Sequence, residues 1–196
     1  MSKLDLMKTA ERLEAAGWAF VALLVAGGCA RDRGEPAREA VEMNLRVRSM
    51  AFDSGSRIPK RHTGDGEDLS PALSWEGVPP GTASLALLCD DPDAPGKAWV
   101  HWVLYDLPAA TRSLTEGVFD RETLPDGSKQ GRNDFGKIGY GGPSPPRGHG
   151  DHHYHFKVYA LDRPLGLPPG ATKAQVDKAM AGRILAEGEL VGIYSR

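Results

Sequence analysis

The sequence predicts one mainly β domain, a sandwich-like fold with few helices, over residues 43–196. Three observations support this prediction. Short apolar runs of strand length, bounded by polar and turn-forming segments, dominate the region. Glycine and proline are frequent, at 24 and 15 of 196 residues, which favours turns and long loops. A single segment in the domain carries good helix signals.

The predicted strands lie at 45–52, 72–75, 84–89, 98–107, 154–161 and 184–194. The run at 84–89 (SLALLC) is continuously apolar, as is typical of a buried central strand. The helix is expected at 172–181, because Thr172 can cap it and Gln175 follows three residues later. Long loops are expected across 111–150.

Residues 1–42 differ in character from the rest. The uncharged run at 17–28 (GWAFVALLVAGG) is shorter than the roughly 20 residues that span a bilayer, and it suits the apolar region of a secretory signal. Small residues directly precede Cys29, as in a bacterial lipobox. We therefore expect a lipoprotein signal peptide at 1–28, lipidation at Cys29 and a polar tether at 29–42. The expected location is the periplasmic side of the bacterial cell envelope.

Two features of this segment depart from the lipobox pattern. Ala26 stands where leucine is usual, and acidic residues balance the basic ones before the apolar run. Translation from Met7 would give a more typical basic start. Another kind of export signal, and a cytoplasmic extension with a helix over 4–24, are the alternative interpretations.

Charge and motif content exclude several function classes. A formal net charge of -2, without a basic run, argues against a nucleic-acid partner. Two cysteines without a C-x-x-C pair favour neither a disulfide framework nor a structural zinc site. The chain has no G-x-S-x-G motif, and Cys89 has no basic neighbour in sequence. We therefore expect no catalytic residues and no cofactor.

Two segments predict an aspartate–histidine pair. Asp91 and Asp93 lie in a proline-stiffened turn after an apolar strand, and their spacing could direct both to one side. Strand alternation places Trp99, His101 and Val103 together on the face of a second strand. Because His101 lies among apolar residues, its ring nitrogens need partners. A plain acidic turn and a satisfied core histidine are the alternatives.

A third segment carries four of the six histidines, between 149 and 155, after a Gly/Pro loop. Alternation places His152 and Tyr154 on the inward face, and His153 and His155 on the outer face. The four side chains therefore do not converge, and we expect no physiological metal site. A Gly/Pro loop, two histidines and Asp91 could together form an anion site, because backbone N–H groups and imidazoles donate to anions.

These motifs resemble a known family. D-P-D-A-P, then H-W, then G-P-x-P-P-x-G-x-G-x-H-x-Y are similar to the two signature regions of the phosphatidylethanolamine-binding protein family, near its bacterial Raf-kinase-inhibitor-like branch. The resemblance covers roughly residues 44–194 and implies a Greek-key β-sandwich with a few short helices. It also implies a ligand pocket built from Asp91, Asp93, Trp99, His101, Pro146, His152 and Tyr154. His153 departs from the family, which usually has arginine there.

The function that this resemblance implies is non-enzymatic binding of a small anion that bears phosphate or carboxylate, such as a phospholipid headgroup. One alternative is a protein-interaction or inhibitor module acting on a protease or kinase through the loops 53–70 and 111–140. A hydrolase with His101 or His152 as general base is the weaker alternative. The expected partners are the anionic ligand and the membrane through the lipid anchor. A homodimer is expected from the resemblance alone.

Overall fold

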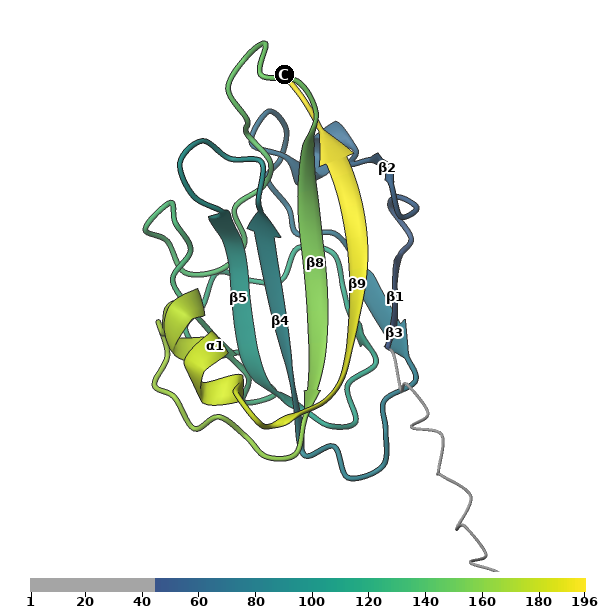
Figure 1. Cartoon of the computed structure of the whole chain (residues 1–196), viewed down its shortest axis with the longest axis vertical. Coiled ribbons are helices and arrows are strands. Elements are labelled where there is room, and N and C mark those ends of the chain that lie inside the picture. Colours follow the sequence, from purple (N-terminus) through teal and green to yellow (C-terminus); the bar gives the residue numbers. More distant parts are fainter. Residues whose placement is uncertain (1–44) are drawn as a thin grey trace, which may run out of the picture. The chain divides into compact units, whose positions relative to one another are not determined.

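The computed structural model describes residues 45–196, which form two β-sheets and one short α-helix (Figure 1). The elements are β1 (Arg46–Ser49), β2 (Ser56–Arg57), the 3-10 helix η1 (Lys60–His62), β3 (Leu73–Glu76), β4 (Ser84–Asp91), β5 (Trp99–Pro108), β6 (Ser113–Leu114), β7 (Lys129–Gln130), β8 (His152–Leu161), α1 (Lys173–Met180) and β9 (Ile184–Tyr194). A strand lies at each of the six predicted positions, and the predicted mainly β fold is confirmed.

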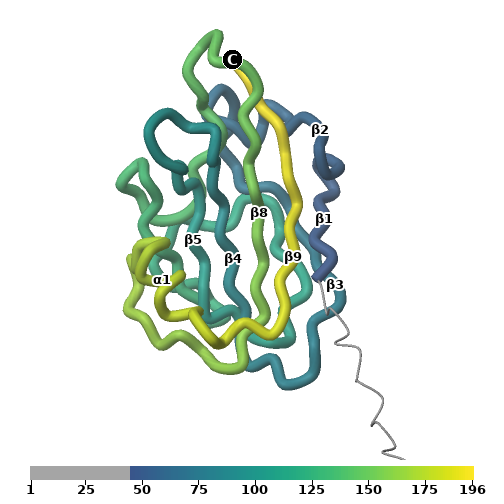
Figure 2. Tube along the Cα trace, viewed as in Figure 1, coloured from purple at the N-terminus to yellow at the C-terminus, as the bar shows by residue number. Residues whose placement is uncertain are grey.

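The larger sheet has six strands in the order β2-β9-β8-β4-β5-β7. Its four long strands, β9, β8, β4 and β5, are antiparallel neighbours that run side by side in Figures 1 and 2. Every residue of β4 is buried, which explains why its sequence is apolar rather than alternating. The strand that carries Asp91 therefore lies at the centre of the sheet.

The smaller sheet has the order β1-β3-β6 and packs against one face of the larger sheet. The core between them includes Trp75 of β3, Leu87 of β4, Trp102 of β5 and Phe156 of β8. Trp75 and Trp102 are almost completely buried. The indole N–H of Trp75 donates to the carbonyl of Thr111, and that of Trp102 donates to the side chain of Gln130. This core fixes the face of the larger sheet on which the inward residues of β8 lie.

Helix α1 covers the opposite face of the larger sheet. Val176 and Met180 of the helix pack with Val103 and Tyr105 of β5. The predicted capping box is present, because Thr172 Oγ1 accepts from the backbone of Gln175 and the Gln175 side chain accepts from the backbone of Thr172. The three layers are thus the small sheet, the large sheet and the helix.

A bulge in β5 overturns one prediction of strand alternation. Cys89 pairs with Trp102 and Asp90 with Val100, so His101 is an extra residue without an opposite partner in β4. Val103 packs with the helix, whereas the His101 ring lies 5.0 Å from the ring of Tyr154 on the opposite face. The prediction that His101 and Val103 share a face is therefore wrong. Because of the bulge, His101 lies on the same face of the sheet as the inward residues of β8, such as Tyr154.

The predicted signal peptide, Cys29 and the tether lie outside the described residues. Between residues 45 and 196, no helix is long and apolar enough to cross a membrane.

We predict that Leu87→Ala lowers the free energy of unfolding by about 2–5 kcal/mol, because Leu87 is fully buried between the sheets. The measurement is urea unfolding followed by tryptophan fluorescence. Leu185→Ala in β9 is the matched control, because Leu185 is 42% exposed and its loss should change stability by no more than about 0.5 kcal/mol. Equal losses in the two variants would contradict the burial described here.

Candidate anion-binding site

A cavity of about 230 Å³ lies where β4 ends and where β5 and β8 begin. Its walls come from three strands and two loops. The lining residues are Asp91, Ala94, Pro95, Trp99, His101, Phe135, Ser144, Pro145, Pro146, His152 and Tyr154. Six of the seven residues predicted for the pocket are among them, and Asp93 is not.

A buried hydrogen bond joins two of these residues. His152 Nδ1 lies 2.7 Å from Asp91 Oδ2, and both side chains are nearly inaccessible, at 1% and 4% exposure. Because a carboxylate only accepts, the imidazole carries its proton on Nδ1 and donates it to Asp91. His152 Nε2 is thereby left to interact with other groups, and the Nδ1 of His149 lies 2.7 Å from it.

His101 of β5 lines the cavity and is held by the loop before β8. Its Nδ1 lies 2.5 Å from the carbonyl oxygen of Gly141, which can only accept. Burial is the main cause that lowers the pKa of His101 below its usual 6.5, although the Gly141 carbonyl and the charge of Asp91 act in the opposite direction. In the neutral ring the proton is on Nδ1, so Nε2 carries a lone pair.

Two polar atoms of the cavity residues are buried and have no hydrogen-bond partner among the described residues. They are the indole Nε1 of Trp99 and the hydroxyl of Tyr154. Burial, and next the negative charge of Asp91, raise the pKa of Tyr154 far above its usual 10, so the phenol keeps its proton. Buried donors without partners are costly, and both residues line the cavity.

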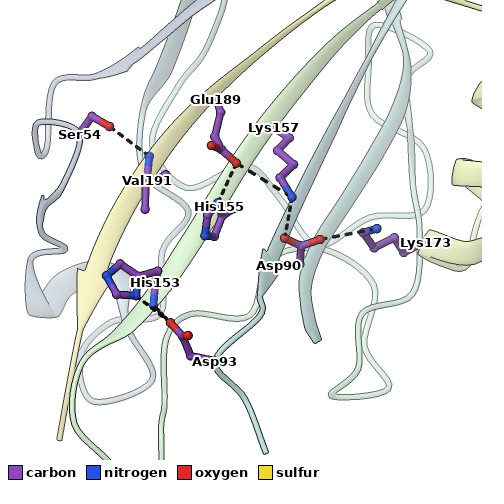
Figure 3. A network of polar contacts seen from close by, with 9 residues as sticks. All are labelled: Ser54, Asp90, Asp93, His153, His155, Lys157, Lys173, Glu189 and Val191. Carbon is purple, nitrogen blue, oxygen red and sulfur yellow. Dashed lines mark hydrogen bonds and ion pairs between the residues drawn. The ribbon is translucent and has the colours of Figure 1, made fainter. Parts of the chain in front are cut away.

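Asp93 lies outside the cavity, contrary to the expectation that it faces the same side as Asp91. Its carboxylate accepts hydrogen bonds from the backbone and from Nδ1 of His153, at 2.9 and 2.7 Å (Figure 3). The side-chain hydrogen bond is the main cause of a lowered pKa for Asp93. The backbone N–H of Asp93 donates to Asp91 Oδ1. Asp93 therefore acts on the cavity indirectly, by stabilising the turn that orients Asp91.

The outer face of the large sheet carries the histidines that alternation placed there. His155 Nδ1 contacts Glu189, and Lys157 lies between Glu189 and Asp90 (Figure 3). Lys173 of α1 reaches the other oxygen of Asp90 at 3.5 Å. These charges neutralise one another. Within residues 45–196, no group of three or more His, Cys, Asp or Glu side chains could hold a metal ion.

Several wall residues were not predicted from the sequence. Phe135 comes from the long loop before β8, and its ring packs edge-on against the rings of Trp99 and His101. Ala94, Pro95 and Pro145 add apolar surface. Residues in turns follow no periodic pattern that would indicate whether their side chains face the cavity. The one signal in the sequence for these wall residues is that some of them lie close to a signature motif.

The loop 143–150 is fixed by the end of β9 and the residues after it. Arg196 donates to Ser144 Oγ and pairs with Asp65, both at 3.0 Å, and its carbonyl accepts from the backbone N–H of Gly148. Figure 2 shows this loop rising beside the end of β9. Pro146 is therefore held at the cavity by contacts that are distant in sequence.

Comparison with known proteins identifies the family of the chain. Residues 48–195 match the family described as phosphatidylethanolamine-binding protein. The chain belongs to the phosphatidylethanolamine-binding protein family. The resemblance read from the motifs is thus confirmed.

The relatives place the chain in a bacterial and archaeal branch of the phosphatidylethanolamine-binding protein family. It is 53% identical over 152 residues to a UPF0098 protein of Methanothermobacter thermautotrophicus, covering 78% of this chain and 99% of the relative. It is 42% identical over 159 residues to the UPF0098 protein YbhB of Escherichia coli, covering 77% of this chain and 100% of the relative. These names specify no ligand.

Two solved structures of the phosphatidylethanolamine-binding protein family share the fold. Escherichia coli YbcL superposes with a TM-score of 0.73 at 36% identity, covering 78% of this chain and 99% of YbcL. A family homologue from Chlamydia trachomatis gives a TM-score of 0.71 at 38% identity, covering 79% and 99%. The architecture of residues 45–196 is therefore that of experimentally determined relatives.

We predict that His101 titrates below pH 6.5, because burial disfavours its charged form. In the window from 6.5 down to that lowered pKa, the unfolded chain binds a proton that the folded protein does not. The His101 contribution to stability is therefore full above pH 6.5 and decreases as the pH falls through this window. NMR titration of the imidazole measures the pKa, and urea unfolding at several pH values measures the stability.

His101→Asn serves as the comparison for this titration, because its amide can still donate to the Gly141 carbonyl but does not titrate. Its free energy of unfolding should decrease less between pH 7 and pH 5 than that of the wild type. A His101 pKa at or above 6.5 would contradict the buried, neutral imidazole.

Proposed function

We propose that this protein binds a small anionic ligand in the cavity between Asp91, His101 and His152. The observation that supports this most strongly is the pair of buried donors without partners, Trp99 Nε1–H and Tyr154 O–H. Because both residues line the cavity, a group that only accepts hydrogen bonds, such as a phosphate, sulfate or carboxylate, is the kind of ligand that these donors favour.

The apolar wall narrows the class of ligand. The wall of the cavity is more apolar than polar, because it includes Trp99, Phe135, Pro145 and Pro146. The volume of about 230 Å³ lies below the roughly 300–1,000 Å³ typical of pockets for drug-sized molecules. An anion with a short organic substituent, such as a phosphomonoester or a phospholipid headgroup, fits both properties.

The charges in the cavity bear on how an anion would be held. The Asp91 carboxylate accepts a hydrogen bond from His152 in a contact that solvent hardly reaches. His101 is neutral near pH 7 and presents a lone pair at Nε2. An anion placed against that atom requires it to be protonated, so binding would be accompanied by proton uptake.

We predict that His152→Ala weakens sulfate binding about 10- to 100-fold, because it removes a donor to the sulfate, and a hydrogen bond to a charged group contributes about 1.5–3 kcal/mol. Sulfate is the probe because it does not titrate between pH 5 and 8. Chemical shifts of the backbone amides of β8 and of the loop 141–150 report the dissociation constant.

His155→Ala is the control for this experiment, because it removes an imidazole of the same strand from the outer face, where it contacts Glu189. Its sulfate affinity should equal that of the wild type, and wild-type affinity should increase as the pH is lowered from 7.5 to 5.5. Equal binding by the wild type and His152→Ala would remove the cavity from the proposal.

We also propose that the protein is held at the cell envelope through a lipid on Cys29, as the segment preceding that residue indicates. Radiolabelled palmitate should then be incorporated by a bacterial host expressing the full chain and should be absent from Cys29→Ser. Wild-type protein that remains unlabelled would contradict the lipid anchor and leave the anion-binding proposal unaffected.

A further inference from the structure

Of the two ring nitrogens of His152, only one is free of the buried contact with Asp91 and could bind a ligand. Its Nδ1 is engaged with Asp91 at 2.7 Å in a fully buried contact. Breaking that contact would leave an unpaired carboxylate in the interior, which is strongly unfavourable. Any anion that binds to His152 must therefore use Nε2.

That nitrogen is already engaged by another residue of the chain. His149 Nδ1 lies 2.7 Å from His152 Nε2, with the two rings tilted by 52° and their centroids 5.0 Å apart. A contact of this length is a direct hydrogen bond with no room for an intervening atom. This holds whichever of the two nitrogens carries the proton.

The surroundings of His149 allow its side chain to leave. Residues 148–150 are all exposed. Gly148 and Gly150 have φ values of +75° and +93°, and no atom lies within 4 Å of where a Cβ would be at either position. The backbone of His149 is tied by one hydrogen bond, from its N–H to the carbonyl of Pro146 at 3.2 Å. Moving the imidazole outward breaks its hydrogen bond to His152 and no core packing.

We propose that His149 is a specificity-determining residue that competes with the anion for Nε2 of His152. In the free protein His149 satisfies His152, and the ligand binds by exchanging a ligand oxygen for the His149 imidazole. Because Nδ1 of His152 donates to Asp91 and an anion only accepts, Nε2 must carry a proton in the bound state. If Nε2–H already donates to His149, no proton is added, and if Nε2 accepts from His149, binding takes up one proton from solvent. This inference deepens the anion-binding proposal and rests on it. If His149 competes in this way, the free energy of ligand binding includes the difference between the ligand's hydrogen bond to Nε2 and the His149 hydrogen bond that it replaces. Ligands with weak acceptor atoms are therefore excluded, and ligands with charged oxygens are favoured.

The test measures sulfate binding by NMR for the wild type, His149→Ala and His149→Asn. His149→Ala removes the competitor, so sulfate should bind about 2- to 10-fold more tightly, as expected for loss of one hydrogen bond of ordinary net strength. His149→Asn places an amide near the position of Nδ1 and should return the affinity toward the wild-type value. His155→Ala is again the matched histidine control, with unchanged affinity.

A second readout separates competition from a general effect on folding. In the ¹⁵N spectrum of the wild-type imidazoles, sulfate should shift His152 Nε2 and His149 Nδ1 together over one binding curve. In His149→Ala, His152 Nε2 should be shifted before sulfate is added.

The outcomes distinguish this inference from the function on which it rests. If the wild type and His149→Ala bind sulfate equally, or the variant binds more weakly, while His152→Ala loses binding, the cavity binds anions and the competitor role of His149 is wrong. If neither protein binds sulfate, both proposals are wrong. Binding by His149→Ala alone would support both and would show that the competing contact is strong.

Discussion

The hydrogen bond between Asp91 and His152 is the constraint on which the arrangement of the site depends. It joins the end of the central strand β4 to the start of β8 in a place that solvent does not reach. Because a buried carboxylate must have a partner, the two strands cannot separate here without a large energetic cost. The same contact fixes the orientation of the His152 ring and therefore the direction in which Nε2 can interact.

A second constraint is the bulge that inserts His101 into β5. Without it, regular alternation would put His101 on the same face as Val103, which packs against α1. The extra residue turns His101 toward Tyr154, and the Gly141 carbonyl then holds its ring. A local irregularity of one strand thus brings the second histidine to the cavity, a common use of bulges beside functional sites.

The candidate site combines a rigid part with a loop part. Asp91, His101, His152 and Tyr154 are on strands of the buried sheet, where packing limits their movement. Pro146 and His149 are on a Gly/Pro loop that is held by hydrogen bonds to Arg196 and by the contact with His152. In the proposed function, the strands would fix the position of the anion, and the loop would contribute the exposed side chain of His149.

The sequence by itself determined the fold class, the family and most residues of the cavity wall. Apolar runs and the capping box are local signals, so they identified β4, β8 and α1 without knowledge of the partners. Only the tertiary structure decided that Asp91 faces the cavity while Asp93 bonds to His153 outside it, and that Phe135 closes the wall. Those directions depend on turns, on a bulge and on contacts between residues far apart in the chain, none of which leaves a periodic pattern in the sequence.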